Sequence, residues 1–133
     1  MKTRILLLIT VVIGLAAMAP AQSVVVTKKK VTYTRPKPIT KYKKTFVVNY
    51  PKIKAANAAL SRRIEVAIAY EKAFPFNLQE EINEIQWLEE ADYTVLYNKN
   101  GILNVELSIQ GTAAYPDGST KSMVVDTKTG KRV

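Results

Sequence analysis

The chain has 133 residues, of which 47% are hydrophobic and 23% charged, a balance typical of one ordinary globular domain. It contains no cysteine and no histidine, which excludes disulfides, thiol chemistry and every mechanism built on a histidine base or metal ligand. The net charge of +9 is uneven, because residues 22–54 hold ten Lys or Arg and no acid, whereas residues 55–95 hold eight acidic and three basic residues. We therefore expect a non-catalytic protein, with no cofactor and no metal, whose positive charge lies mainly in an N-terminal arm.

Residues 1–21 are predicted to be a signal peptide. Two basic residues precede an apolar run from Ile5 to Met18, and Ala19-Pro20-Ala21 supplies the small-x-small pattern that signal peptidase reads. The run is shorter than the roughly 20 apolar residues of a membrane span. The sequence thus predicts a secreted or periplasmic protein that starts at Gln22 after cleavage and has no stable transmembrane segment. An uncleaved N-terminal anchor is the alternative.

Residues 22–44 form a basic extended arm or linker ahead of a single domain, residues 45–133. Pro36 and Pro38 favour an extended chain, so the arm either pairs as one or two short edge strands or stays a flexible linker. Its cations could bind anionic wall polymer or lipid headgroups by counterion release, or simply be solvated; nucleic acid is not the expected partner. The candidate polyanion-binding residues are Lys28, Lys29, Lys30, Arg35, Lys37, Lys41, Lys43 and Lys44.

One strand and one long helix are predicted next. The stretch "TFVVNY", residues 45–50, has the composition of a strand, which Pro51 is expected to end. Over residues 54–74 apolar residues recur every three or four positions, as on one face of a helix, and Pro75 ends it. The expected face comprises Ile53, Ala56, Leu60, Ile64, Ala67, Tyr70 and Phe74.

A second, short helix is predicted after Asn77, which with Glu80 resembles a capping box. Acidic residues gather on this helix and at the start of the next strand. Paired carboxylates can hydrolyse glycosides, but in these positions they ordinarily face water, and no calcium-loop spacing is present. The acidic set consists of Glu80, Glu81, Glu84, Glu89, Glu90 and Asp92.

From Glu90 onward apolar residues alternate with polar ones, as in strands with one buried face. The apolar positions are odd-numbered, and a slip of one residue would send a whole row to solvent. Three-residue loops closed by glycine at 99–101, 116–118 and 128–130 would keep the parity, whereas a two-residue Asn100-Gly101 turn would break it. The three rows are Ala91, Tyr93, Val95 and Tyr97; Leu103, Val105, Leu107 and Ile109; and Met123, Val125 and Thr127.

These loops predict specific strand pairs. The first loop would pair Tyr97 with Leu103 and Val95 with Val105, and the second would pair Ile109 with Val125. The elements together predict an α+β fold, an antiparallel β-meander of three to five strands packed against one long α-helix, plus one short helix.

The third loop would pair Val125 with Val133 and leave the outer edge of the strand at 120–127 without a partner. An open edge is completed by another chain or domain, or protected by charge, here Lys121, Lys128, Lys131 and Arg132; a fragment that lacks a following domain is the third reading. Strand addition near Met123–Val133 defines an alternative function, a structural or assembly protein whose open edge strand another chain completes.

Aromatic residues could form a surface on which sugars stack. Tyr93 and Tyr97 share the parity of the buried row and are expected in the core. Trp87 and Tyr115 are therefore the candidate aromatic contact residues.

A succession of motifs, namely a strand, "YPKI", a long helix, "YTVLYNKNGILNVELS", a Tyr-Pro-Asp-Gly turn and "MVVDTKTGKRV", resembles a small module of unknown function. That module precedes the catalytic domain in PdaC-type peptidoglycan deacetylases and lies in the extracellular part of the anti-sigma-V factor. The resemblance covers residues 45–133, without the histidine-containing turn segment and the domain that usually follows. It implies a secreted, non-catalytic binding or sensor module of the cell envelope, without deacetylase activity, whose partner is an envelope polymer or a protein.

Overall fold

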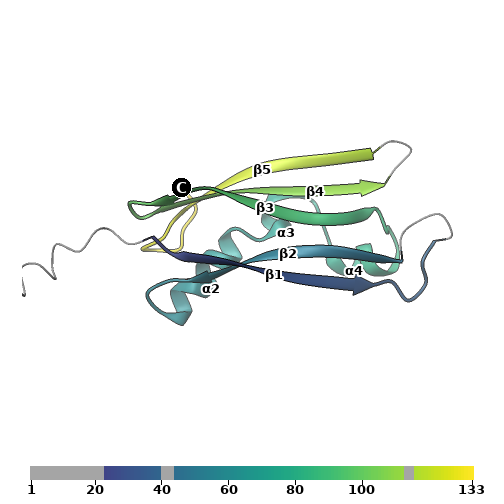
Figure 1. Cartoon of the computed structure of the whole chain (residues 1–133), viewed down its shortest axis with the longest axis horizontal. Helices are drawn as coiled ribbons and strands as arrows, with labels where there is room; N and C mark the ends of the chain where they lie inside the picture. The colour runs from purple at the N-terminus through teal and green to yellow at the C-terminus, as the bar shows by residue number, and fades with distance from the viewer. Residues whose placement is uncertain (1–22, 40–43, 113–115) are drawn as a thin grey trace, which may run out of the picture.

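A computed structural model describes residues 23–39, 44–112 and 116–133 and shows a five-stranded mixed sheet accompanied by three short helices (Figure 1). The strands lie in the sheet in the order of the chain. They are β1 (Val25–Thr34), β2 (Thr45–Lys54), β3 (Leu88–Lys99), β4 (Ile102–Thr112) and β5 (Pro116–Asp126), and the described helices are α2 (Ala58–Ala67), α3 (Tyr70–Ala73) and α4 (Leu78–Asn83). None of these helices is long and apolar enough to cross a membrane.

The predicted fold, an antiparallel meander packed against one long helix, is wrong. Only β3, β4 and β5 form an antiparallel meander. β2 and β3 are parallel neighbours, and a parallel pair needs a crossover connection instead of a tight turn. The three helices between residues 58 and 83 form this crossover, and β1 pairs antiparallel with β2 along its whole length.

β2 continues to Lys54. The prediction that Pro51 ends this strand is therefore wrong. Proline cannot donate a backbone hydrogen bond and is tolerated where one side of a strand has no neighbour. β2 pairs with β3 only at Val47 and Val48, so at Pro51 only its β1 side is paired. The residues expected to begin the long helix therefore belong to the sheet.

The rest of the predicted long helix is broken in two. α2 ends at Ala67, and Ala69 is extended, with φ −65° and ψ 147°, before α3 begins. In an uninterrupted helix Ile68 and Tyr70 would point about 200° apart. The break lets both side chains enter the core, where the Tyr70 hydroxyl donates to the backbone carbonyl of Asn49.

The start of α4 is as predicted, because the Asn77 side chain accepts hydrogen bonds from the backbone N–H groups of Gln79 (3.0 Å) and Glu80 (3.2 Å). The helix is a short one, from Leu78 to Asn83, and Leu88 already belongs to β3. The expectation that its acidic residues face water is wrong for Glu81, which is buried.

The turn between β3 and β4 differs from the predicted three-residue loop. Lys99 pairs with Ile102 across a two-residue turn in which Asn100 and Gly101 have φ values of 54° and 76°, the left-handed pair of a type I′ hairpin. A bulge between Val95 and Tyr97 then restores the predicted Val95–Val105 pair. Val95 and Tyr97 are nevertheless 37% and 38% exposed, so this half of the predicted apolar row is not buried.

The predicted loop at residues 116–118 is also wrong. Ile109 pairs with Ser119 instead of Val125, and Gly118 lies inside β5 without a positive φ. The residues between the two strands, 113–115, lie outside the described part of the chain. The odd-numbered residues of β4 and β5 nevertheless share the buried face of the sheet, because Leu103 pairs with Val125 and both are buried.

The third reversal does occur, with Gly130 at φ 75°. Its register differs by one residue from the prediction, since Val125 bridges to Arg132 instead of Val133. The backbone N–H of Val133 donates to the carbonyl of Val124 (3.0 Å). The last residues therefore pair with the final part of β5.

The core lies between the helices and one face of the sheet. The odd-numbered rows of β4 and β5 are buried as predicted, and Leu60, Ile64 and Phe74 face them from the helices and the segment that follows. Tyr93 and Ala67 are partly buried against this core. Further buried members are Val24, Phe46, Val48, Ile53, Ile68, Tyr70, Leu88 and Ala91.

Candidate functional site

The basic arm is an edge strand over the part that the structure describes as β1. Because side chains alternate along a strand, Lys28 and Lys30 lie on one face and Lys29 on the other. Lys37 and Lys44 are exposed beyond the strand, and Lys41 and Lys43 lie outside the described residues. The described lysines of the arm therefore do not line one surface.

Lys28 forms an ion pair with Asp92 of β3, with 2.9 Å between Nζ and Oδ1, and lies 5.2 Å from the centre of the Tyr93 ring. The hydrogen bond raises the pKa of Lys28. Burial raises the pKa of Asp92, but hydrogen bonds from Lys28, the Tyr93 backbone and the Asn49 side chain outweigh it and hold this pKa below its ordinary value. Lys28 is thus held by contacts with two residues of β3.

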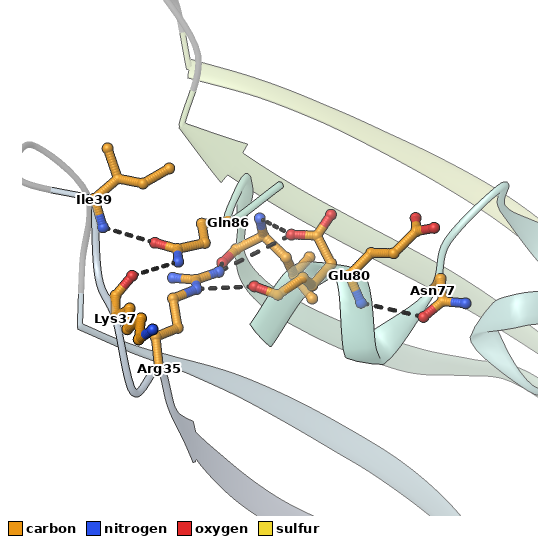
Figure 2. A network of polar contacts seen from close by, with 8 residues as sticks. Arg35, Lys37, Ile39, Asn77, Glu80 and Gln86 are labelled. Atoms are coloured by element: carbon orange, nitrogen blue, oxygen red, sulfur yellow. Dashed lines mark hydrogen bonds and ion pairs between the residues drawn. The ribbon is translucent and has the colours of Figure 1, made fainter. Parts of the chain in front are cut away.

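Arg35 is buried, at 1% exposure, in a polar network between the β1–β2 connection and the α4–β3 corner (Figure 2). Its Nε donates to the carbonyl of Glu81 (3.0 Å), and its Nη2 donates to the carbonyl of Leu88 (2.7 Å). The Glu81 carboxylate lies 4.0 Å from Nη2, and the guanidinium lies 4.5 Å from the centre of the Phe46 ring. Burial lowers the pKa of Arg35.

Gln86 completes this network. Its backbone has a left-handed φ of 53°, and its amide donates to the carbonyl of Lys37 and accepts from the N–H of Ile39, both at 2.8 Å (Figure 2). Among the described residues, no buried side-chain nitrogen or oxygen lacks a hydrogen-bond partner. The network therefore holds two connections together and leaves no described group unpaired for chemistry.

Sequence reasoning missed this network, since it placed Arg35 among surface cations and Glu81 in water. One signal was available. Arg35 is the single arginine in a lysine-rich arm, and the planar guanidinium suits buried, multiply bonded positions far better than an ammonium does.

The two candidate aromatic contacts have different outcomes. The Trp87 ring lies against Gly111 of β4, where an added Cβ would fall 2.2 Å from ring atoms, and the side chain packs partly buried against the core. Tyr115 lies outside the described residues. Tyr97, predicted in the core, is exposed, with the Lys99 ammonium 5.5 Å from its ring centre.

A groove of about 810 Å³ lies between α2 and the C-terminal segment, residues 127–133. We call it the cationic groove. Arg62, Arg63 and Lys72 line it from the helical side, and Lys131 and Arg132 line it from the C-terminal segment. The apolar side chains that line it are Ala59, Val66 and Ala67.

Hydrogen bonds and close packing hold the C-terminal wall of the groove in place. The Asp126 carboxylate accepts from the backbone N–H of Lys128 (2.7 Å), and the N–H of Thr127 donates to the carbonyl of Gly101 (2.8 Å). At Gly130 a Cβ would lie 2.8 Å from Cβ of Arg63, so the missing side chain allows the segment to approach α2 closely. The groove is therefore preformed.

The charge of the cationic groove is not neutralised by the described part of the chain. The ion pairs of the described residues join Lys28 to Asp92, Arg35 to Glu81 and Lys52 to Glu65. None of them includes a cation of the groove. The described lining residues contain no Asp or Glu. From the sequence, Lys131 and Arg132 are expected to protect an open edge, and no local pattern connects them with Arg62 and Arg63.

The chain matches no protein-family model, and a search of curated proteins finds no significant match. The similarity to the PdaC-type module therefore rests on the sequence motifs alone.

Proposed function

We propose that this protein is an exported, non-catalytic binding module of the cell envelope, and that its ligand is an anionic envelope component held in the cationic groove. The main support for this proposal is that α2, α3 and the C-terminal segment bring five cations around one hollow. These are Arg62, Arg63, Lys72, Lys131 and Arg132. Export is supported by the pattern of residues 1–21: a basic start, an apolar run and a small-x-small site.

Binding fits the groove better than catalysis does. Lys and Arg are cations at neutral pH, so these side chains supply charge and hydrogen-bond donors but no proton acceptor. Among the described residues no group of three or more Asp or Glu is placed to hold a metal ion. The groove is thus equipped to attract and hold an anion.

The ligand should carry at least two anionic groups, since cations line both walls. Arginine binds phosphate or carboxylate through paired N–H donors, and lysine contributes a point charge. Exposed charges are screened within about 8 Å at physiological ionic strength, so affinity should fall steeply with salt.

A charge-matched pair of variants tests the proposal, with inorganic polyphosphate as the probe. In one variant Arg62, Arg63, Lys131 and Arg132 are changed to Gln; in the other Lys29, Lys30, Lys37 and Lys44 are. Both lose the same charge. We expect the groove variant to lose at least about tenfold in affinity, with a shallower dependence on salt, and the arm variant to lose clearly less. Equal losses, or no binding by the unchanged protein, would contradict the proposal.

A further inference from the structure

The cationic groove is lined by apolar side chains as well as charged ones. Ala59 and Val66 are seven residues apart on α2, two helical turns, so they lie on the same side of the helix, with Arg62 and Arg63 between them. Val66 is 52% exposed although it lines a hollow. An exposed valine beside Arg62 and Arg63 on α2 offers a contact that a purely hydrophilic anion cannot use.

The opposite wall leaves room for such a contact. Gly130 brings backbone, not side chain, against Arg63, while Lys131 and Arg132 follow directly and line the same groove. The chain therefore presents positive charge on both walls of the groove, next to the apolar strip of Ala59, Val66 and Ala67 on α2. Charge complementarity calls for an anion, and the strip calls for hydrocarbon next to it.

From this arrangement we infer that the ligand of the cationic groove is an anionic phospholipid: the phosphate pairs with the arginines, and the first methylene groups lie on Val66 and Ala67. The inference rests on the proposed function, because it specifies which anion the groove takes. Paired N–H donors of arginine match phosphate oxygens, and burial of hydrocarbon adds affinity that the headgroup alone lacks.

Three soluble probes separate the parts of this ligand in titrations of the full chain. Short-chain phosphatidylglycerol below its micelle concentration has both phosphate charge and acyl groups. Glycerol phosphate has the charge alone. Short-chain phosphatidylcholine has the same acyl groups without net charge, and it also reports any binding of acyl groups to the apolar N-terminal run. We expect phosphatidylglycerol to bind at least about fivefold more tightly than either control probe.

Two valines of nearly equal exposure supply the decisive control. Val66→Ser should weaken phosphatidylglycerol binding about fivefold and leave glycerol phosphate binding unchanged, whereas Val25→Ser, at a β1 position that is 54% exposed, should change neither. Arg62→Gln with Arg63→Gln should weaken phosphatidylglycerol binding by about 30-fold.

Each other outcome has a definite meaning. Equal effects of the two valine variants, or glycerol phosphate binding as tightly as phosphatidylglycerol, would overturn the lipid inference. If polyphosphate binds in the groove but phosphatidylglycerol does not, the inference fails and the proposed function stands. If neither anion binds, both fail.

Discussion

The Arg35 guanidinium lies inside the fold because the carbonyls of Glu81 and Leu88 and the Glu81 carboxylate surround it. The same carboxylate accepts the backbone N–H of Leu88 at 2.8 Å. Burying two charges is costly, and removing only one partner leaves the other uncompensated. Arg35 and Glu81 should therefore depend on each other energetically.

Arg35→Met keeps much of the side-chain volume but leaves the Glu81 carboxylate buried without its cation. We expect the free energy of unfolding in urea to fall by about 3–5 kcal/mol. Adding Glu81→Gln should recover part of this loss, because a neutral amide can still accept from Leu88. Lys29→Met, at an exposed position, is the control, and a loss in Arg35→Met no larger than in this control would contradict the prediction.

The Lys28–Asp92 pair should be visible in the acid range. The pKa of Asp92 is lower in the folded protein than its ordinary value of 3.8, so the carboxylate stabilises the fold above that pH, and this contribution is lost as pH falls through the folded-state value. Asp92→Asn should therefore be less stable than the unchanged protein near pH 6, with the difference shrinking toward about pH 3.

Melting temperatures at low salt across this range would measure the effect. Both side chains are partly exposed, 47% for Lys28 and 37% for Asp92, so the difference should be small and should decrease with added salt. Asp117→Asn, in an exposed part of β5, serves as the control. A difference at pH 6 that stays constant down to pH 3 would show that Asp92 acts by other means.

At the scale of elements, the β3–β4 hairpin combines a tight turn with a compensating irregularity. The two-residue turn alone would place the apolar rows of the two strands on opposite faces, and the bulge after Val95 realigns Val95, Tyr93 and Ala91 with their partners. Turn and bulge together give the inner half of β3 the register that a three-residue loop would have given.

Asn100 tests the turn, because it is a non-glycine residue with a left-handed φ of 54°. Asn100→Gly and Asn100→Ala both remove the amide that donates to the Tyr97 hydroxyl, but only alanine resists the left-handed conformation. We expect the alanine variant to be about 1 kcal/mol less stable than the glycine variant in urea unfolding. Equal stabilities would argue against a type I′ turn.

How far the fold could be predicted differs between elements. The cap at Asn77, the left-handed Gly101 and Gly130, and the buried parity of β4 and β5 follow from local patterns, and all are present. The break between α2 and α3 could not be predicted, because Ile68 and Tyr70 both gain burial only once the sheet is in place. The same holds for Pro51, which sits in β2 only because β3 diverges there.

The candidate site was less predictable than the fold. Arg62 and Arg63 read as the outer face of a helix, and Lys131 and Arg132 as charges beside an open edge. Their meeting depends on the parallel crossover that places α2 beside the end of β5, and side-chain periodicity carries no information about that neighbour. The two walls of the groove lie far apart along the chain, so local sequence patterns could not predict it.

At the scale of the whole molecule, both outer strands of the sheet are protected. β1 carries three consecutive lysines, and the last residues of the chain pair with the end of β5. The remainder of the β5 edge, residues 117–122, is exposed and polar. Charge and polarity discourage edge-to-edge pairing, which weakens the case for an assembly protein completed by strand addition.

Lys29→Val with Lys30→Val should therefore promote self-association. We expect the unchanged protein to be monomeric at high concentration, and this variant to form larger species as concentration rises, measured by light scattering. Lys37→Val with Lys44→Val removes the same charge outside the strand and should stay monomeric. A stable dimer of the unchanged protein would instead favour strand completion.

Trp87 is the single tryptophan of the chain, and its ring rests on the backbone of Gly111. Its fluorescence should therefore change when β4 separates from the start of β3, so unfolding can be followed without a label. Trp87 does not line the cationic groove. Filling the groove should leave the emission spectrum almost unchanged, and a titration needs a reporter dye attached near Thr129 instead.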